Sequence, residues 1–547
     1  YSEADVEEFN GSLLENGSDI DVSPDSSPNV SDFESDEEED IAPLAQWSDD
    51  LAVFEINDFH SQVGSTIELG PLSNEKDFFL KFFPECLVEK LVIETNNYAK
   101  KMGDTKPDPK WYETSITEMF AYLGIYIVMS IMQIPKYSIA WMTSVYFGIP
   151  GIPEVMTRER IEKIGKYFHA NDTSVNPPRG QPGHDNIFHI RPFYDTVLHK
   201  CLENYNPPKN QSIDEGMIAF KGRLSFKQYL PAKPTRFGIK VWERAHPQTG
   251  YVHEFQVYVG KPDGQRGRMT EEGLGSRVVK DLTRKIINKN HHIYMDNFFS
   301  SPQLFEDLRR DGLFCCGTVR GNRKGMPEPL KILSDLKSQG DMKTMQKETL
   351  VCVAWKDKKI VHILFNNMDP TQLSSVTRRE KTGRRKEATC PKVADEYSKN
   401  NGGVDIADQN RMHYSSCRKA KKWWKYLFWF LFDTAICNAL ICMKESPNHQ
   451  NKTKSGKEKK RTQLEFRMNL AKQMVAGFQG SRKRKALSNV DAEGLSHWPG
   501  RFPKRGRCKM CSKEGRRHEV FIGCKQCQVH LCVDHDCFER YHSQLTN

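Results

Sequence analysis

The sequence predicts a multidomain α/β protein, and three observations support that prediction. A run of short strand patterns, broken by helical patterns, occupies the middle of the 547-residue chain. Apolar helical patterns lie on both sides of this run, and a cysteine-rich segment lies near the C-terminal end. Because 38% of the residues are hydrophobic and 28% are charged, the chain can bury several cores, and we expect three or four domains.

The N-terminal tail, residues 1–50, is predicted to be disordered. It contains 17 Asp and Glu residues and no Lys or Arg, and it has little apolar surface to offset the entropy cost of ordering. The whole chain has a formal net charge of +9, so the remainder carries a net charge of about +26. A body this basic suits a polyanionic partner such as a nucleic acid. The tail then serves solubility, or shields the body from non-specific DNA.

Helical patterns cover residues 75–208 and again residues 415–480. Two apolar stretches in these ranges, 119–134 and 426–443, approach the length of membrane spans. The second contains Asp433 and Asn438, which are costly at bilayer depth. We predict buried core helices and no membrane partner. No signal peptide is visible, and nine scattered cysteines in apolar settings favour a reducing compartment.

The region 209–320 has the most informative order of elements. Three strands are followed by a helix, a strand, a helix and a strand, which is the order of a ribonuclease-H-like domain. The last helix of that fold is delayed by an insertion, residues 321–399, and returns at residues 400–414. The predicted elements are a strand from Ile213, a hairpin of 238–245 and 251–259, a helix around Val278, Leu282 and Ile286, a strand at 292–295, a helix from Pro302, a strand at 313–317, and inserted strands at 350–354 and 360–365.

Three aspartates fall where this fold brings its chain to one edge of the sheet. Asp214 lies on the first strand, Asp296 ends the fourth, and Asp405 lies on the late helix, which two glycines open. Three carboxylates can hold two Mg²⁺ or Mn²⁺ ions, one activating the attacking hydroxyl and one stabilising the leaving oxygen. Asp408, three residues after Asp405, is a candidate fourth ligand or supporting carboxylate. Each aspartate alone could be an ordinary strand-end or helix-cap residue, but their joint placement favours a catalytic site.

The residues around these aspartates resemble the catalytic blocks of the piggyBac family of transposases, and the similarity runs from about residue 75 to the C-terminus. The blocks are Ser212-Ile213-Asp214-Glu215 with Phe220-Lys221-Gly222-Arg223, Lys233-Pro234 and Phe237-Gly238-Ile239-Lys240; Asp296-Asn297-Phe298-Phe299-Ser300; Gly317-Thr318-Val319-Arg320 with Asn322-Arg323; and Gly402-Gly403-Val404-Asp405 with Asp408-Gln409. Asn401 and Phe365-Asn366-Asn367 depart from the family pattern without touching a predicted metal ligand.

This resemblance implies a cut-and-paste DNA transposase with Asp214, Asp296 and Asp405 as its catalytic triad. Such an enzyme nicks the transposon end, forms a hairpin through the freed 3′-hydroxyl and joins the element to TTAA target DNA. The resemblance also implies that the two helical segments form one dimerisation and DNA-binding domain. We therefore expect transposon-end and target DNA as partners, a homodimer that cuts both ends together, and a nuclear location.

A basic aromatic segment follows the third aspartate and is a candidate DNA contact. Cations that pair with phosphates alternate there with indoles that can stack on an unpaired base. Trp424 more plausibly opens the core helix, whereas Trp423 matches the position where the family has a Trp near the hairpin tip. Two arginines in the insertion are further candidates, although a solvated loop explains them equally well. The candidate DNA contacts are Arg418, Lys419, Lys421, Lys422, Trp423, Arg378 and Arg379.

The C-terminal segment, residues 504–547, is predicted to bind two structural Zn²⁺ ions after a basic linker, residues 481–503. Its paired Cys and His residues suffice for two tetrahedral sites, and metal binding must supply much of the folding free energy of so short a segment. A cross-brace would place Cys508, Cys511, Cys532 and His535 on one ion, and Cys524, Cys527, Cys537 and His542 on the other. Sequential pairing, or substitution by His518 or His530, fits the spacing as well.

Two other functions are alternatives to an active transposase. A domesticated descendant of a transposase would bind DNA without cutting it, although such a protein would tolerate the loss of a carboxylate. A chromatin reader or ubiquitin-ligase scaffold would use the predicted zinc finger, but it leaves the three aspartates unexplained. Cleavage of labelled transposon ends in the presence of Mg²⁺ separates these alternatives from an active enzyme.

Overall fold

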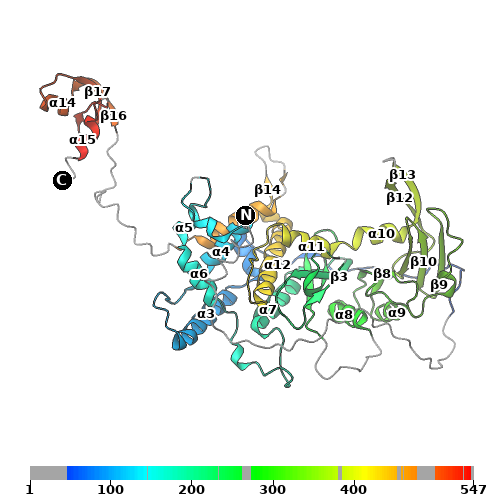
Figure 1. Cartoon of the computed structure of the whole chain (residues 1–547). Coiled ribbons are helices and arrows are strands. Elements are labelled where there is room, and N and C mark those ends of the chain that lie inside the picture. The colour runs from blue at the N-terminus through cyan, green and yellow to red at the C-terminus, as the bar shows by residue number, and fades with distance from the viewer. Residues whose placement is uncertain are drawn as a thin grey trace. The chain divides into compact units, whose positions relative to one another are not determined.

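The computed structural model describes residues 46–144, 146–231, 233, 235–260, 273–379, 385–452, 458–459, 461–476, 478, 499–525, 527–533 and 535–543. The chain divides into two compact units, with the boundary between Phe478 and Gln479 (Figure 1). Most of the predicted acidic tail and of the predicted basic linker lies outside the described residues. The finer division of the first unit into domains stays a prediction.

A nine-stranded mixed sheet forms the centre of the first unit. Its strands lie in the order β4-β5-β3-β7-β8-β11-β10-β9, and β6 pairs with β5. β7 runs parallel to both β3 and β8, whereas the remaining pairs are antiparallel. The strands are β3 (Asn210–Ala219), β4 (Gln228–Tyr229), β5 (Phe237–Ala245), β6 (Val252–Val257), β7 (His292–Met295), β8 (Phe314–Val319), β9 (Met342–Lys347), β10 (Leu350–Lys356) and β11 (Ile360–Phe365).

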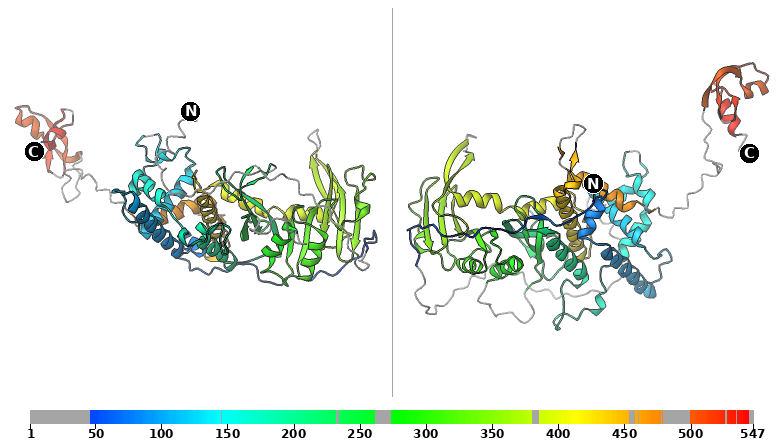
Figure 2. Two further views of the ribbon diagram at one scale, coloured as in Figure 1. Left: turned by 60° about the horizontal axis from the view of Figure 1, so that its bottom comes forward. Right: turned by 180° about the vertical axis from the view of Figure 1, so that it is seen from behind.

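The strands predicted between residues 209 and 320, and the two predicted in the insertion, are confirmed. The inserted residues also form β9, and all three inserted strands extend the same sheet beyond β8 (Figure 2). A separate two-stranded hairpin, β12 (Leu373–Arg379) and β13 (Arg385–Pro391), follows them. The insertion therefore enlarges the central sheet while delaying the last helix.

Helices cover the sheet on both sides. On one side α8 (Leu274–Thr283) and α9 (Pro302–Arg310) bury apolar residues such as Leu282 and Phe305 in one cluster with Ile213 of β3. On the other side lies α11 (Gly403–His413), which follows α10 (Lys392–Asn400). The helix predicted around Val278 is present but ends at Thr283, and Ile286 reaches the same core from the turn that follows. Further along, Asn288 and Asn290 both adopt a left-handed φ of 58°.

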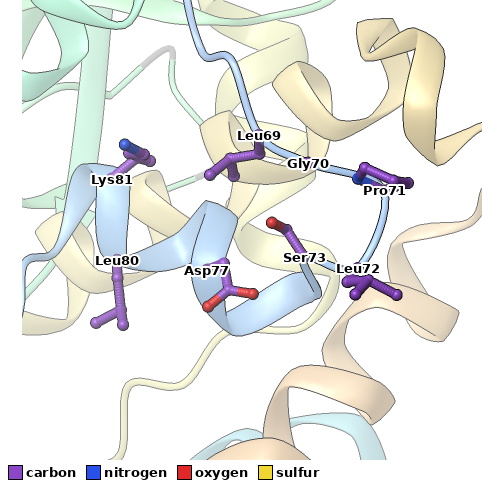
Figure 3. Close-up of a pocket in the computed structure, with 8 residues that line it drawn as sticks. All are labelled: Leu69, Gly70, Pro71, Leu72, Ser73, Asp77, Leu80 and Lys81. Carbon is purple, nitrogen blue, oxygen red and sulfur yellow. The ribbon is translucent and has the colours of Figure 1, made fainter.

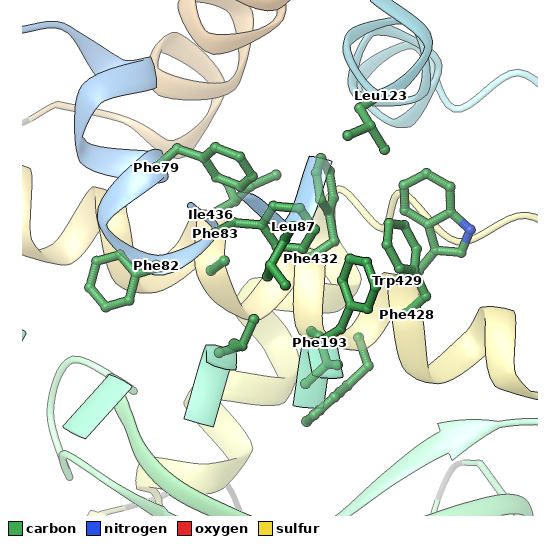
Figure 4. Packing of buried hydrophobic residues seen from close by; sticks show 14 of the residues in the cluster. Phe79, Phe82, Phe83, Leu87, Leu123, Phe193, Phe428, Trp429, Phe432 and Ile436 are labelled. Carbon is green, nitrogen blue, oxygen red and sulfur yellow. The ribbon is translucent and has the colours of Figure 1, made fainter. Parts of the chain in front are cut away.

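The helical patterns before and after the sheet share one hydrophobic core. Phe79 and Phe83 pack against Phe428 and Phe432 of α12 (Trp424–Glu445), as Figure 4 shows. The other helices and short strands of this part are α2 (Glu75–Phe82), α3 (Glu85–Thr105), α4 (Ile116–Met132), α5 (Gly151–Val155), α6 (Arg158–Tyr167), α7 (Arg191–Glu203), α13 (Gln463–Val475), β1 (Gly64–Ser65), β2 (Tyr205–Asn206), β14 (Asn451–Lys452) and β15 (Glu458–Lys459).

α12 is long and apolar enough to span a membrane, yet nearly all of its apolar stretch is buried inside the unit. Its polar residues have specific partners. Asp433 is paired with Arg467 of α13 at 3.1 Å, and the Asn438 amide bonds both backbone groups of Val252 on β6 at 3.0 and 2.9 Å. Buried polar groups with such partners are expected of a core helix, as predicted. The Asn438 contacts also hold α12 against β6, at the edge of the sheet.

The second unit is a small three-stranded sheet with two short helices. Its core consists mainly of cysteine side chains, with Met510 and Leu531 between them. So small an apolar core supplies little folding free energy by itself. The elements are β16 (Pro499–Arg507), α14 (Lys509–Lys513), β17 (Glu519–Cys524), β18 (Val529–His530) and α15 (Cys537–Ser543), with the strands in the order β16-β17-β18.

Candidate active site and zinc centres

The parallel pairing of β3 with β7 places two of the predicted catalytic aspartates side by side. Ile213 lies opposite Met295 in this pair, and the next residues along the two strands are Asp214 and Asp296. Residues at matching positions of neighbouring parallel strands face the same side of the sheet at a spacing of about 4.8 Å. The two carboxyl groups therefore share one edge of the sheet.

Helix α11, which carries Asp405 and Asp408, packs on the face of β3 that carries Asp214. A Cβ atom on Gly403 would lie 2.9 Å from Cβ of Ser212, so the helix begins in direct contact with the strand. Further along, Oδ1 of Asp408 lies 3.4 Å from the position of a Cβ on Gly216. Ser212, Asp214 and Gly216 alternate onto one face of β3. Asp405, one helical turn before Asp408, is close enough for its charge to raise the pKa of Lys233 beside Asp214.

Negative charge accumulates at this edge. Burial raises the pKa of Asp214 to about 7, and the charges of Asp296 and Glu215 act in the same direction, against Lys233 and the Glu215 N–H. Burial likewise raises the pKa of Asp296, whose Oδ1 accepts the Phe298 N–H at 2.9 Å. A nearby cation stabilises the charged form of desolvated carboxyl groups that lie close together.

Lys233 lies among these acidic groups. Its Nζ is 3.7 Å from Oδ2 of Asp214 and donates to the Glu215 carbonyl at 3.1 Å. Burial lowers its pKa, but the charges of Asp214, Glu215, Asp405 and Asp408 together raise it above the usual value. Lys233 therefore interacts electrostatically with carboxylates of both β3 and α11. The sequence predicted no role for this lysine beyond its place in a motif.

The oxygen donors of this edge are the type that Mg²⁺ and Mn²⁺ prefer. Asp214, Asp296 and Asp405 are the residues that would hold such ions. Within the described ranges, however, every group of three or more ligand atoms that lie within 4.8 Å of one another belongs to the second unit. The aspartates are neighbours that do not form a closed cage, and bound ions would have to draw them together.

A buried ion pair, which the sequence did not predict, fixes α11 to the sheet. Glu243 of β5 lies directly opposite Asp214 and is fully buried. Arg411 of α11 donates to its two carboxylate oxygens at 2.7 and 2.9 Å, and to Oδ1 of Asp408 at 2.5 Å. Bidentate pairing of this kind fixes the orientation of both partners. The pair therefore sets where Asp405 and Asp408 lie.

The loop after Asp296 is held by a second arginine. Arg323 donates to the carbonyl groups of Asn297 and Phe298 at 2.9 Å each, and to that of Ser300 at 3.1 Å. The backbone that carries Asp296 into the site is thus bonded at three successive points. Arg323 belongs to one of the blocks that resemble the piggyBac family, but the sequence did not predict its role.

In the predicted DNA-contact segment, some side chains are exposed to solvent and others contact the helical part of the first unit. Lys419 and Lys421 are exposed, whereas Arg418 donates to the Met129 carbonyl of α4. Lys422 donates to the Tyr98 hydroxyl at 3.4 Å. Trp423 is half-buried, with its ring centroid 5.9 Å from His189 and 5.4 Å from Phe226.

Trp424 is only 2% exposed, in agreement with the prediction that it opens the core helix. In the insertion, Arg378 donates to Asp357 at 3.1 Å. Arg379 lies on β12, but its side chain is outside the described residues. DNA contact by these residues stays a prediction.

The first cysteine cluster of the second unit has the spacing of a zinc site. Cys508, Cys511, Cys532 and Cys537 are buried together, and the Sγ atom of Cys511 lies 3.6 Å from those of Cys532 and Cys537. Four sulfurs about 2.3 Å from one Zn²⁺ in a tetrahedron are about 3.8 Å apart. Burial disfavours the Cys508 thiolate, but backbone donors of Cys511 and Cys532 outweigh it and lower its pKa to about 7.

The second cluster consists of Cys524, Cys527 and His542. The Sγ of Cys527 lies 3.6 Å from Nε2 of His542, the spacing expected of two ligands of one Zn²⁺. The other ring nitrogen, Nδ1, is 2.7 Å from the Phe538 carbonyl, a contact that orients the ring as in known zinc sites.

The grouping of zinc ligands differs from the expected cross-brace at Cys537 and His535. Cys537 joins the first cluster, and His535 is exposed with its ring against His518. The physical reason is helical geometry: five residues along α15 rotate the side-chain direction by about 140°. Cys537 and His542 therefore point to different ions, although the pairs still interleave along the chain.

The surface hollow drawn in Figure 3 lies elsewhere. Its lining comes from the segment before α2 and from α2 itself, namely Leu69, Gly70, Pro71, Leu72, Ser73, Asp77, Leu80 and Lys81. None of the predicted site residues is among them. The candidate active site is instead an open edge of the sheet.

Comparison with known proteins gives consistent results. A family model described as "Transposase IS4" matches residues 74–440. Human "PiggyBac transposable element-derived protein 5" is 28% identical over 421 residues, which are 75% of this chain and 78% of that protein. Human "PiggyBac transposable element-derived protein 2" is 25% identical over 516 residues, 90% of this chain and 80% of that one.

The fold is similar to that of a solved transposase. A cryo-EM structure of the piggyBac transposase synaptic complex with hairpin DNA aligns with a TM-score of 0.64 and 24% identity. The alignment covers 87% of this chain and the whole of that one. At this identity the likeness concerns the fold.

Replacing Arg411 with Ala should destabilise the first unit by about 3–5 kcal/mol, because Glu243 would be left as an unpaired buried charge. Urea denaturation followed by tryptophan fluorescence measures this loss. The matched control is the double variant Glu243→Leu/Arg411→Met, which removes both charges and should recover most of the stability. Equal stability of Arg411→Ala and the wild-type protein would contradict the anchoring role.

Zinc content should distinguish the two possible ligand sets. We expect two Zn²⁺ per chain by atomic absorption, a loss of at least one ion in Cys537→Ala, and no loss in His535→Ala. Cys86→Ala, which changes an exposed cysteine of the first unit, is the control for cysteine loss as such. Loss of an ion in His535→Ala would show that the grouping is wrong, because only the expected cross-brace uses His535 as a ligand.

Proposed function

The chain belongs to the piggyBac family of transposases, and from this premise we propose that it is an active cut-and-paste DNA transposase. Membership of this family implies divalent metal ions and DNA as a partner. The observation that carries the proposal is the placement of Asp214 and Asp296 at matching positions of β3 and β7, with α11, the helix that contains Asp405, packed against the same face of β3.

The order of the sheet supports a ribonuclease-H-like core. The strands lie in the order β6-β5-β3-β7-β8. β5 and β6 are antiparallel to their neighbours on one side of β3, and β7 and β8 are parallel to theirs on the other side. In that fold the first and fourth strands are neighbours, as β3 and β7 are here. The late helix α11 completes the set of elements that carries the three aspartates.

The proposed reaction is a series of phosphoryl transfers at one site. Two Mg²⁺ ions, when bound, would activate the attacking hydroxyl and stabilise the leaving oxygen. Asp214, Asp296 and Asp405 would hold these ions. Arg411 keeps Asp408 and the helix in place, and Arg323 holds the backbone after Asp296. Lys233 offers a positive charge beside Asp214 to a non-bridging phosphate oxygen.

The finer steps rest on the family resemblance. We propose nicking at the transposon end, hairpin formation by the 3′-hydroxyl and joining at TTAA, by a homodimer acting in the nucleus. The similar solved complex contains hairpin DNA, which supports this order of steps. We propose further that two Zn²⁺ ions fold the second unit, whose exposed Arg501, Lys504 and Arg505 favour contact with transposon-end DNA.

The alternative function is that of a domesticated DNA-binding protein without cleavage activity. The human relatives are named as derived from transposable elements, and this favours the alternative. The retention of all four carboxylates, Asp214, Asp296, Asp405 and Asp408, favours the enzyme. A binding protein would be free to lose them.

Cleavage of labelled transposon ends tests the proposal. With Mg²⁺ the wild-type protein should give nicked and hairpin products, and Asp214→Asn should lower the rate at least about 1,000-fold, because a metal ligand is lost. The control is Asp311→Asn, which changes an exposed aspartate and should cleave like wild type. DNA binding by the wild-type protein without cleavage in Mg²⁺ or Mn²⁺ would favour the domesticated alternative instead.

A further inference from the structure

An exposed pair of aromatic rings lies on the β4–β5 hairpin, whose second strand runs on to the proposed active site. The rings of Tyr229 on β4 and Phe237 on β5 are 4.6 Å apart with an interplanar angle of 32°. Their residues are 49% and 45% exposed, respectively. Two neighbouring rings held at the surface leave aromatic area in water that a flat apolar ligand can cover.

The backbone holds this pair in place. Tyr229 and Phe237 are directly opposite in the β4–β5 pairing, and Leu230 N–H donates to the Arg236 carbonyl at 2.8 Å. At Gly238 the strands approach so closely that a Cβ atom would lie 2.1 Å from the Ile218 carbonyl oxygen. Only glycine fits there, and Phe237 is thereby fixed at the start of β5.

The stretch of sequence that contains the pair carries only positive charge. Between Gly216 and Trp242 the chain contains six Lys or Arg residues and no Asp or Glu. The ammonium group of Lys227 lies 5.9 Å from the centre of the Phe237 ring. Lys221, Arg223 and Arg236 are exposed. This charge complements a phosphodiester backbone, while the rings complement bases.

The pair also has a defined position relative to the aspartates. Phe237 and Glu243 are six residues apart on β5 and so face the same side of the sheet, and Glu243 is directly opposite Asp214. Six residues of strand span about 20 Å, which is about six base pairs of duplex DNA. Lys233, in the turn that joins β4 to β5, reaches Asp214. The hairpin therefore connects the aromatic pair to the catalytic edge.

We propose that Tyr229 and Phe237 form a stacking site for unpaired bases of the DNA strand that flanks the scissile phosphate. This inference rests on the proposed function, since it takes DNA as the substrate. The rings stack on one or two splayed bases, and the cations of the hairpin bind the adjoining phosphates. The site binds without regard to base identity, because every base has a flat apolar face.

Binding of a fluorescein-labelled single-stranded oligonucleotide tests this site in the absence of divalent metal. All variants are made in the Asp214→Asn background, so that cleavage plays no part in the readout. Tyr229→Ala and Phe237→Ala should each weaken single-strand binding about tenfold, with a smaller effect on a fully paired duplex. Tyr229→Phe, which keeps the ring, should restore the affinity.

The control is Ile332→Ala, which removes an exposed apolar side chain outside the predicted DNA-binding segments and should leave binding unchanged. Thermal melting must show that each variant is folded. Unchanged single-strand affinity in folded Tyr229→Ala and Phe237→Ala, or equal loss for single strand and duplex, would overturn the proposal. Because no cleavage is measured, a protein that never cuts DNA can still pass this test, so the two proposals fail separately.

Discussion

The contact between α11 and β3 is the constraint on which the rest of the site depends. Asp214 and Asp296 are neighbours by strand pairing alone, but Asp405 is 109 residues beyond Asp296 in the sequence. Gly403 permits the helix to touch Ser212, and the Glu243–Arg411 pair holds the helix in that position. A buried ion pair is a poor source of stability but a strong determinant of geometry. Here it determines where the third carboxylate lies.

The distribution of charge fits a metal-dependent reaction on DNA. Although the chain after the tail has a large positive net charge, several acidic side chains meet at the candidate site, where burial and the neighbouring charges of Asp296 and Glu215 raise the pKa of Asp214. Lys233 lies beside Asp214, and the exposed Arg236 belongs to the same β4–β5 hairpin. Divalent ions would relieve the repulsion inside, while these cations bind the phosphates outside.

The sequence predicted the local elements well because each has its own periodic signal. The strand ending at Asp296, the buried helix around Asp433 and the inserted strands at 350–354 and 360–365 lie as expected. Long-range partners have no such signal. Glu243 and Arg411 are 168 residues apart, and nothing local predicts that the inserted strands extend the same sheet.

The zinc ligands show the same limit at short range. Spacing identified every residue of the two described clusters, but it assigned Cys537 to the wrong cluster and included His535, which lies in neither. The assignment of Cys537 depends on the direction in which α15 presents its side chains. Lys233 could have been found in the sequence, because it belongs to a run of six cations without an acidic residue. Its contact with Asp214, however, depends on how the hairpin folds back over the sheet.

A crystal structure with Mn²⁺ and transposon-end DNA, with data collected at the manganese absorption edge, tests the central claim most directly. We expect anomalous peaks at the edge formed by Asp214, Asp296 and Asp405, within about 2.2 Å of their carboxylate oxygens and next to a phosphate. Manganese bound elsewhere on the chain, with these three carboxylates uncoordinated in the DNA complex, would contradict the account.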